Sequence, residues 1–121
     1  MRPDQIHYTI QFDVADGKMP EFERLAAKAV AIVKADEPGT IVYRWQIDAT
    51  GASVQVHERF VDEAAMGVHL AGPVATEIFP AAMEISAVTR FDVHGDVSAE
   101  SSTALTNFGA KIFRSWKGFD S

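Results

Sequence analysis

The chain has 121 residues, of which 47% are hydrophobic, and its formal net charge at pH 7 is −6. This length and composition fit one domain with a sizeable core. The acidic balance, without any run of Lys or Arg, argues against nucleic acid or an anionic membrane as a partner. Without cysteine, the chain has no disulfide, thiolate nucleophile or Cys-ligated metal. No stretch approaches the roughly 20 apolar residues that span a bilayer, so a cytoplasmic protein is expected.

The first predicted elements are a strand and a long helix. Residues 5–14 alternate between apolar and polar side chains, which predicts a half-buried strand. A turn and Pro20 then favour the start of a helix, and the helix should end near the segment DEPG at 36–39. Apolar residues recur along it at helical spacing: Phe22, Leu25, Ala26, Ala29, Ile32 and Val33.

A predicted hairpin follows this helix. The turn DATGAS at 48–53 joins a second strand to a third strand over residues 54–60. In the second strand, the alternating pattern places four residues on one face: Ile41, Tyr43, Trp45 and Ile47.

Two helical pieces and a last strand complete the pattern. Asp62 is a predicted N-cap for a short helix that ends near AGP at 71–73, and a second helical piece is expected over 74–83. The first piece carries Met66, His69 and Leu70 on one face. The last strand is predicted over 85–94. Its alternation places Ala87, Thr89, Phe91 and Val93 on one face and Val88, Arg90, Asp92 and His94 on the other.

The order β-α-β-β-α-β predicts an α+β ferredoxin-like sandwich, in which helices cover one face of an antiparallel sheet. We expect this domain to occupy residues 1–95 and a C-terminal extension to occupy residues 96–121. The extension should begin with a short helix capped by Ser98 and pack on the domain or on a dimer partner. Its aromatic residues either only pack or form part of a pocket wall: Phe108, Phe113, Trp116 and Phe119.

Glu58 and His69 are predicted to meet between the sheet and the helices. Strand parity places Glu58 on the face of the valines and sends His57 and Arg59 to the other face. A buried carboxylate needs a partner, and His69 returns about 10 Å along its helix while Glu58 lies about 13 Å back along its strand. A His on an apolar helix face can be a core residue, or a carboxylate can tune it into a base near neutral pH.

The other three histidines are predicted to share the outer face of the sheet. In a sheet with the strand order 4-1-3-2, His94, His7 and His57 point toward the same end of that face. Three imidazoles could ligate zinc or iron, but His57 is expected to lie two or three residues out of step, which is about 10 Å along the strand. Otherwise these rings are solvated or lie at a subunit interface.

The segments EPGTIVYRWQID and VHERFVDEAAMGVHL together resemble the antibiotic biosynthesis monooxygenase family of dimeric α/β barrels. The matching features are the helix that ends in EPGT, the aromatic second strand, and a Glu and an aromatic residue two apart at the end of the third strand. A His eleven residues after that Glu completes the match. The resemblance extends to about residue 94, and the ending GAKIFRSWKGF resembles the C-terminal extension of some members.

The resemblance implies a homodimer with a pocket between sheet and helices in each subunit. Characterised relatives include oxygenases that use neither flavin nor metal and rely on an electron-rich substrate anion to react with dioxygen. Glu58, Phe60 and His69 are the positions that carry over to that pocket. The haem-degrading branch needs a first-strand Asn, a Trp closing the third strand and a further helical His, and this chain has none of these.

Two classes of function remain open at this point. The first is a cofactor-independent monooxygenase or isomerase acting on a quinol or phenolic substrate, in which Glu58 and His69 remove a proton. Five residues would then hold the aromatic ring: Tyr43, Trp45, Phe60, Phe79 and Trp116. The second class is a noncatalytic small-ligand-binding protein that uses the same pocket. A dimer is also expected because the outer sheet face would otherwise be exposed, and its predicted residues are of mixed polarity: Val42, Val88, Gln11, Gln46 and Gln55.

Overall fold

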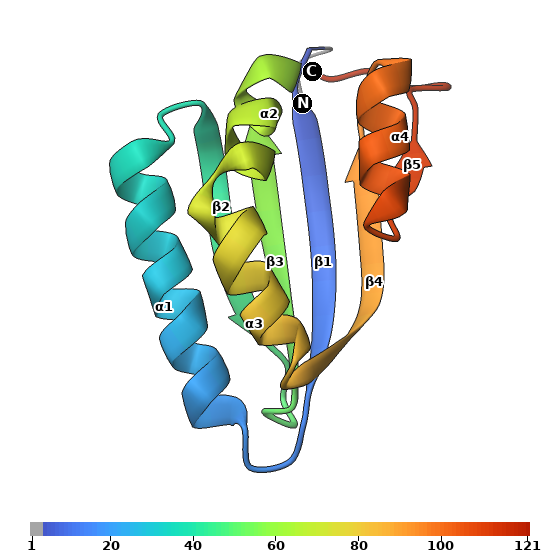
Figure 1. The fold of residues 1–121 in the computed structure, drawn as a ribbon. Coiled ribbons are helices and arrows are strands. Elements are labelled where there is room, and N and C mark those ends of the chain that lie inside the picture. Colours follow the sequence, from blue (N-terminus) through green and yellow to red (C-terminus); the bar gives the residue numbers. More distant parts are fainter. Residues whose placement is uncertain (1–3) are drawn as a thin grey trace.

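The computed structural model describes residues 4–121, so the predicted start of the domain at residue 1 lies outside the described residues. Five strands form one sheet in the order β2-β3-β1-β4-β5, and α1, α2 and α3 lie over one of its faces (Figure 1). The first four strands pair antiparallel, which confirms the predicted ferredoxin-like fold and its strand order. The elements are β1 (Ile6–Val14), α1 (Met19–Asp36), β2 (Thr40–Ile47), β3 (Ser53–Phe60), α2 (Glu63–Ala71), the π-helix η1 (Val74–Ile78), α3 (Phe79–Met83), β4 (Ser86–His94), α4 (Ala99–Asn107) and β5 (Lys111–Phe113).

The alternating pattern of β1 places its apolar residues in the core, as predicted. Ile6, Tyr8, Ile10 and Phe12 are buried on the face that the helices cover. Because β1 lies between β3 and β4, its core-facing side chains pack against those of both neighbouring strands. The centre of the sheet therefore forms the floor of the helix-covered core.

Helix α1 packs through the face that its periodicity predicts. Phe22, Ala29 and Val33 are buried, and the helix has Pro20 in its first turn, where a missing N–H leaves no intrahelical bond unmade. It ends at Asp36, next to a close approach between two backbones. A Cβ atom built on Gly39 would lie only 2.5 Å from Cβ of Ala65 in α2. Only glycine fits there, so the segment after α1 lies directly against α2.

Two β-bulges change the predicted alternation of the outer strands. The register of β2 shifts between Thr40 and Val42, so Ile41 is exposed instead of sharing the core face with Tyr43 and Trp45. The pairing of β4 with β1 shifts between Gln11 and Phe12. As a result Val88 packs against the core, whereas the sequence pattern placed it on the outer face with Ala87 and Thr89 inside.

Helix α2 begins after Asp62 and ends at Ala71, as the sequence predicts. The carboxylate of Asp62 accepts a hydrogen bond from the backbone N–H of Ala65 at 2.8 Å, which caps α2. The piece predicted over 74–83 divides into η1 and α3, with Pro80 in the first turn of α3. These short helices continue the helical layer over the sheet beyond the end of α2 (Figure 1).

The C-terminal segment adds a helix and an edge strand to the sheet. Ser98 caps α4 as predicted, since its hydroxyl accepts from the N–H of Ser101. Leu105 of α4 is fully buried in the core, and β5 pairs parallel with β4. The carboxylate of Glu63 in α2 accepts hydrogen bonds from Ser98 and Ser101, which connects α2 to α4.

Among residues 4–121, no helix is long and apolar enough to cross a membrane.

Candidate functional site

A pocket lies between the core face of the sheet and the helical layer. The space between its walls amounts to about 570 Å³, its opening to solvent included. The strands contribute most of its floor, and α2, η1 and α3 form its opposite wall. The lining is almost entirely apolar and rich in aromatic rings, and Glu58 and His69 bring charge to it. Its aromatic lining residues are Tyr8, Phe12, Tyr43, Trp45, Phe79, Phe91 and Phe108.

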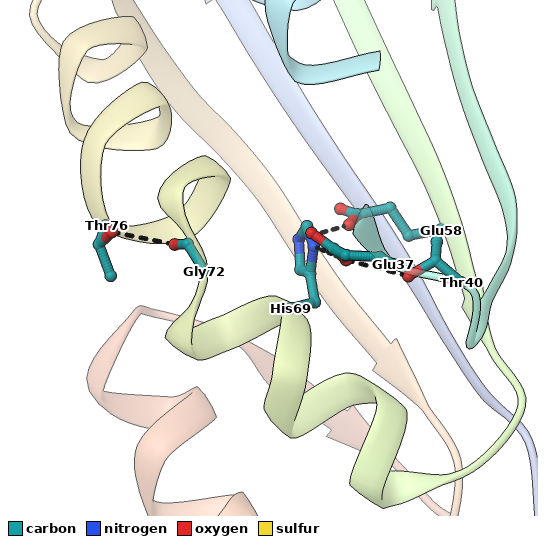
Figure 2. Close-up of polar contacts among 6 residues, drawn as sticks. All are labelled: Glu37, Thr40, Glu58, His69, Gly72 and Thr76. Carbon is teal, nitrogen blue, oxygen red and sulfur yellow. Dashed lines mark hydrogen bonds and ion pairs between the residues drawn. The ribbon is translucent and has the colours of Figure 1, made fainter. Parts of the chain in front are cut away.

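Glu58 and His69 meet at this pocket, which confirms the contact predicted from strand parity and helix length. Nε2 of His69 lies 2.9 Å from Oε1 of Glu58, and a second carboxylate approaches the other side of the ring. Nδ1 of His69 lies 2.7 Å from Oε1 of Glu37 (Figure 2). All three residues are at least 94% buried. The histidine therefore sits between two buried carboxylates.

This arrangement fixes the protonation state of His69. Carboxylate oxygens accept hydrogen bonds and do not donate them, so a ring that faces one at each nitrogen carries a proton on both. Burial works against the charged ring, but the contacts with Glu58 and then Glu37 outweigh it and raise the pKa of His69 to about 9. His69 is thus a cation at neutral pH. With a proton on each nitrogen, the imidazole has no lone pair left to accept another.

Glu37 is the site residue that the sequence reasoning missed. It follows the last residue of α1, and its buried carboxylate also accepts a hydrogen bond from the hydroxyl of Thr40 at 3.1 Å. The signal was present in the sequence, because Glu37 lies four residues after Val33 and eight after Ala29. Both of those residues are buried on one face of α1, and Glu37 continues that face by one turn.

Three ionisable side chains form one row across the middle of the sheet. Glu58 pairs with Tyr8 of β1 on one side and with Tyr43 of β2 on the other, so all three point into the helix-covered layer. Burial, and then the charge of Glu58, raises the pKa of both tyrosines. Both phenols therefore stay neutral and can act as hydrogen-bond donors. The hydroxyl of Tyr8 is buried and has no hydrogen-bond partner among residues 4–121.

The five residues predicted to hold an aromatic ligand take three different positions. Tyr43, Trp45 and Phe79 line the pocket. Phe60 lies behind it, fully buried, with its ring centroid 5.3 Å from that of His69. Trp116 is 87% exposed and does not line the pocket of its own chain. Of the C-terminal aromatic residues, Phe108 lines the pocket. It follows the end of α4, and its ring centroid lies 6.5 Å from that of Phe79.

The three remaining histidines form a stack on the outer face of the sheet. The ring centroid of His7 lies 5.6 Å from that of His94 and 6.2 Å from that of His57. The pairing does place His57 opposite Thr9, two residues out of step with His7, but the side chains lean together and the predicted separation of about 10 Å is wrong. Within residues 4–121, no group of three or more His, Cys, Asp or Glu side chains could hold a metal ion.

The fold and the pocket define a small α+β protein of the ferredoxin-like class with an aromatic pocket between sheet and helices. The family model of the antibiotic biosynthesis monooxygenases matches residues 6–81. The chain belongs to this family. No curated protein matches it.

Solved structures support the same fold. MupZ from Pseudomonas fluorescens aligns with a TM-score of 0.81 at 18% identity, covering 98% of this chain and 95% of that one. SnoaB, a cofactor-independent oxygenase from Streptomyces nogalater that was crystallised as a mutant, aligns with a TM-score of 0.65 at 21% identity, covering 79% and 94%. Protein SO0527 from Shewanella oneidensis aligns with a TM-score of 0.65 at 26% identity, covering 76% and 88%.

Proposed function

We propose that the protein is a cofactor-independent monooxygenase that acts on a phenolic or quinol substrate bound in the aromatic pocket. The observation that carries this proposal is the position of Glu58, an ionisable carboxylate in a mostly apolar, aromatic lining. A flat aromatic ring suits such walls, and the substrate hydroxyl would give its proton to Glu58. The family of the chain and the cofactor-independent oxygenase among its structural neighbours support this assignment.

The chemistry begins with deprotonation of the substrate. The phenolic O–H bond breaks, the proton moves to Glu58, and the electron pair stays on the substrate oxygen. The electron-rich phenolate then forms a carbon–oxygen bond with dioxygen at a ring carbon that carries hydrogen, and Glu58 returns its proton to the resulting peroxide anion. The oxygen–oxygen bond of the hydroperoxide breaks, its outer hydroxide leaves with the proton of that ring carbon as water, and a quinone remains. One atom of dioxygen enters the product and the other enters water. His69, held as a cation by Glu37 and Glu58, supplies the positive charge that stabilises an ionised Glu58 in an apolar site.

Oxygen uptake with a panel of phenols, naphthols and hydroquinones tests the proposal. We expect uptake above the uncatalysed rate with at least one phenol of the panel, and incorporation of one labelled atom from ¹⁸O₂ into the product. The noncatalytic alternative makes a different prediction with the same panel. Tight binding of these compounds without oxygen uptake would identify the protein as a ligand-binding module.

We also propose that the protein works as a homodimer in the cytoplasm, a reducing compartment that suits a chain without cysteine. The helices cover one face of the sheet (Figure 1). The outer face carries the hydrogen-bonded side chains of Gln11 and Gln55 together with Val42. Such a mixed surface suits a partly hydrated contact that closes two sheets into an α/β barrel. Residues 96–121 would form an extension whose exposed Trp116 and Phe119 pack on the partner.

Sedimentation velocity tests the dimer. We expect a single species of twice the chain mass at micromolar concentration, because the rings of Trp116 and Phe119 are 87% and 89% exposed and need a surface to cover them. Replacing Trp116 and Phe119 together by serine should weaken the dimer without unfolding the chain, since neither ring is part of the core. A monodisperse monomer of the parent chain would contradict this prediction.

A further inference from the structure

The hydroxyl of Tyr8 is a buried hydrogen-bond donor that the protein leaves unused. Tyr8 is 1% exposed, it lines the aromatic pocket, and its oxygen has no partner among residues 4–121. A buried hydroxyl without a partner destabilises the folded chain, and phenylalanine in its place would avoid that loss. A bound ligand with a polar atom beside the Tyr8 hydroxyl would supply the missing hydrogen-bond partner.

The position of Tyr8 indicates which ligand atom would meet its hydroxyl. Tyr8 lies directly opposite Glu58 in the pairing of β1 with β3, and residues paired in this way have Cβ atoms about 5 Å apart on the same face. One oxygen of Glu58 is already occupied by His69. A ligand hydroxyl that donates to Glu58 from within the pocket would therefore also lie beside the Tyr8 hydroxyl.

We propose that the hydroxyl of Tyr8 binds the same substrate oxygen from which Glu58 removes the proton. Tyr8 donates a hydrogen bond to this oxygen, and the bond becomes stronger when the oxygen turns into an anion. The Tyr8 O–H bond itself stays intact, and the substrate proton goes to Glu58. This inference rests on the proposed phenol chemistry and adds the group that stabilises the phenolate.

The surroundings of Tyr8 suit this role. Its ring is held edge-to-face by Phe60 and Phe91, with centroid distances of 5.0 and 5.4 Å, so the donor is fixed before the ligand arrives. Burial and the neighbouring Glu58 raise the pKa of the phenol, which keeps the donor proton in place at neutral pH. A donor that keeps its proton beside a group that accepts one is the arrangement that stabilises an oxyanion.

A matched pair of ligands tests the proposal without requiring turnover. The probes are 4-nitrophenol and nitrobenzene, which differ by the hydroxyl, and their affinities are measured by calorimetry for the parent, Tyr8→Phe and Tyr43→Phe. We expect Tyr8→Phe to weaken 4-nitrophenol binding by about 10-fold and to leave nitrobenzene binding unchanged. Tyr43→Phe makes the same chemical change on the other side of Glu58 and should weaken 4-nitrophenol binding less.

Two further readouts separate a ligand-binding role from a structural one. Visible absorbance reports ionised 4-nitrophenol, and we expect its pH midpoint in the complex to lie higher for Tyr8→Phe than for the parent. The melting temperature of Tyr8→Phe without ligand should equal or exceed that of the parent, because the unpaired hydroxyl is removed. A clear loss of melting temperature, or an equal loss of affinity for both probes, would overturn the proposal.

The test also separates this inference from the proposed oxygenase activity. If no phenol supports oxygen uptake but the hydroxyl-specific loss in Tyr8→Phe is seen, the role of Tyr8 in binding stands and the oxygenase assignment fails. If the parent binds neither probe nor any other phenol of the panel, the inference and the proposed function both fail.

Discussion

Replacing Glu58 by glutamine is expected to lower the rate of oxygen uptake with a phenolic substrate by about 10²- to 10⁴-fold, the usual cost of losing a general base. Glutamine keeps the shape of the side chain and removes its ability to take a proton. His69 is already protonated, with a pKa of about 9, so it cannot replace Glu58 as the base at neutral pH. The measurement is the turnover number on the best substrate of the panel, together with its KM.

The control for this variant is His57→Ala. His57 directly precedes Glu58 in β3 but points to the outer face, where it contacts the hydroxyl of Thr9. We expect its replacement to leave turnover within about two-fold of the parent value, in line with the small effect of most changes away from a site. If Glu58→Gln retained the parent turnover number and changed only KM, the carboxylate would be a binding group and the proposed base would be wrong.

The sequence predicted the parts of the fold that depend on local periodicity. The alternation from Ile6 to Phe12 is strict, so both the strand and its buried face could be read from it. The contact between Glu58 and His69 could also be predicted. Alternation along the strand fixes the face on which Glu58 lies, and the length of the capped helix fixes how far back along the sheet His69 reaches. These features follow from geometry over a few residues.

Features that depend on a neighbouring strand could not be predicted. Ile41 and Val88 lie next to β-bulges, and a bulge reverses the alternation of a strand without a mark in its own sequence. Trp116 lies outside any helix or strand, so no periodic pattern indicates which way its side chain points. The pairing with a neighbouring strand determines which face of the sheet Ile41 and Val88 occupy.

The role of His69 within the site depends on a third residue, Glu37, which lies 32 positions before it in the chain. With Glu58 alone beside it, the ring has a free nitrogen, and a neutral imidazole that acts as a base is a reasonable expectation. Glu37 occupies that second nitrogen and adds a second negative charge. The ring then holds its proton past neutral pH, which is why the proposed mechanism assigns the base to Glu58, the carboxylate that lines the pocket.

This cluster also makes a prediction about stability and pH. The pKa of His69 in the folded chain, about 9, lies above its ordinary value of 6.5, so the folded state binds the proton more tightly than the unfolded state. The resulting stabilisation is fully present below pH 6.5 and is lost as the pH rises through 9. Urea unfolding should therefore show the free energy of unfolding falling by roughly 3 kcal/mol between pH 6.5 and pH 10.

His69→Gln should remove this pH dependence and lower stability at neutral pH. The glutamine is uncharged, so the buried carboxylates of Glu37 and Glu58 on either side of it would be left without a cation, which costs about 3 to 5 kcal/mol at pH 7. His57→Gln on the outer face is the matched control and should keep the parent profile. A parent chain with constant stability from pH 6.5 to 10 would show that the two carboxylates do not hold a proton on His69.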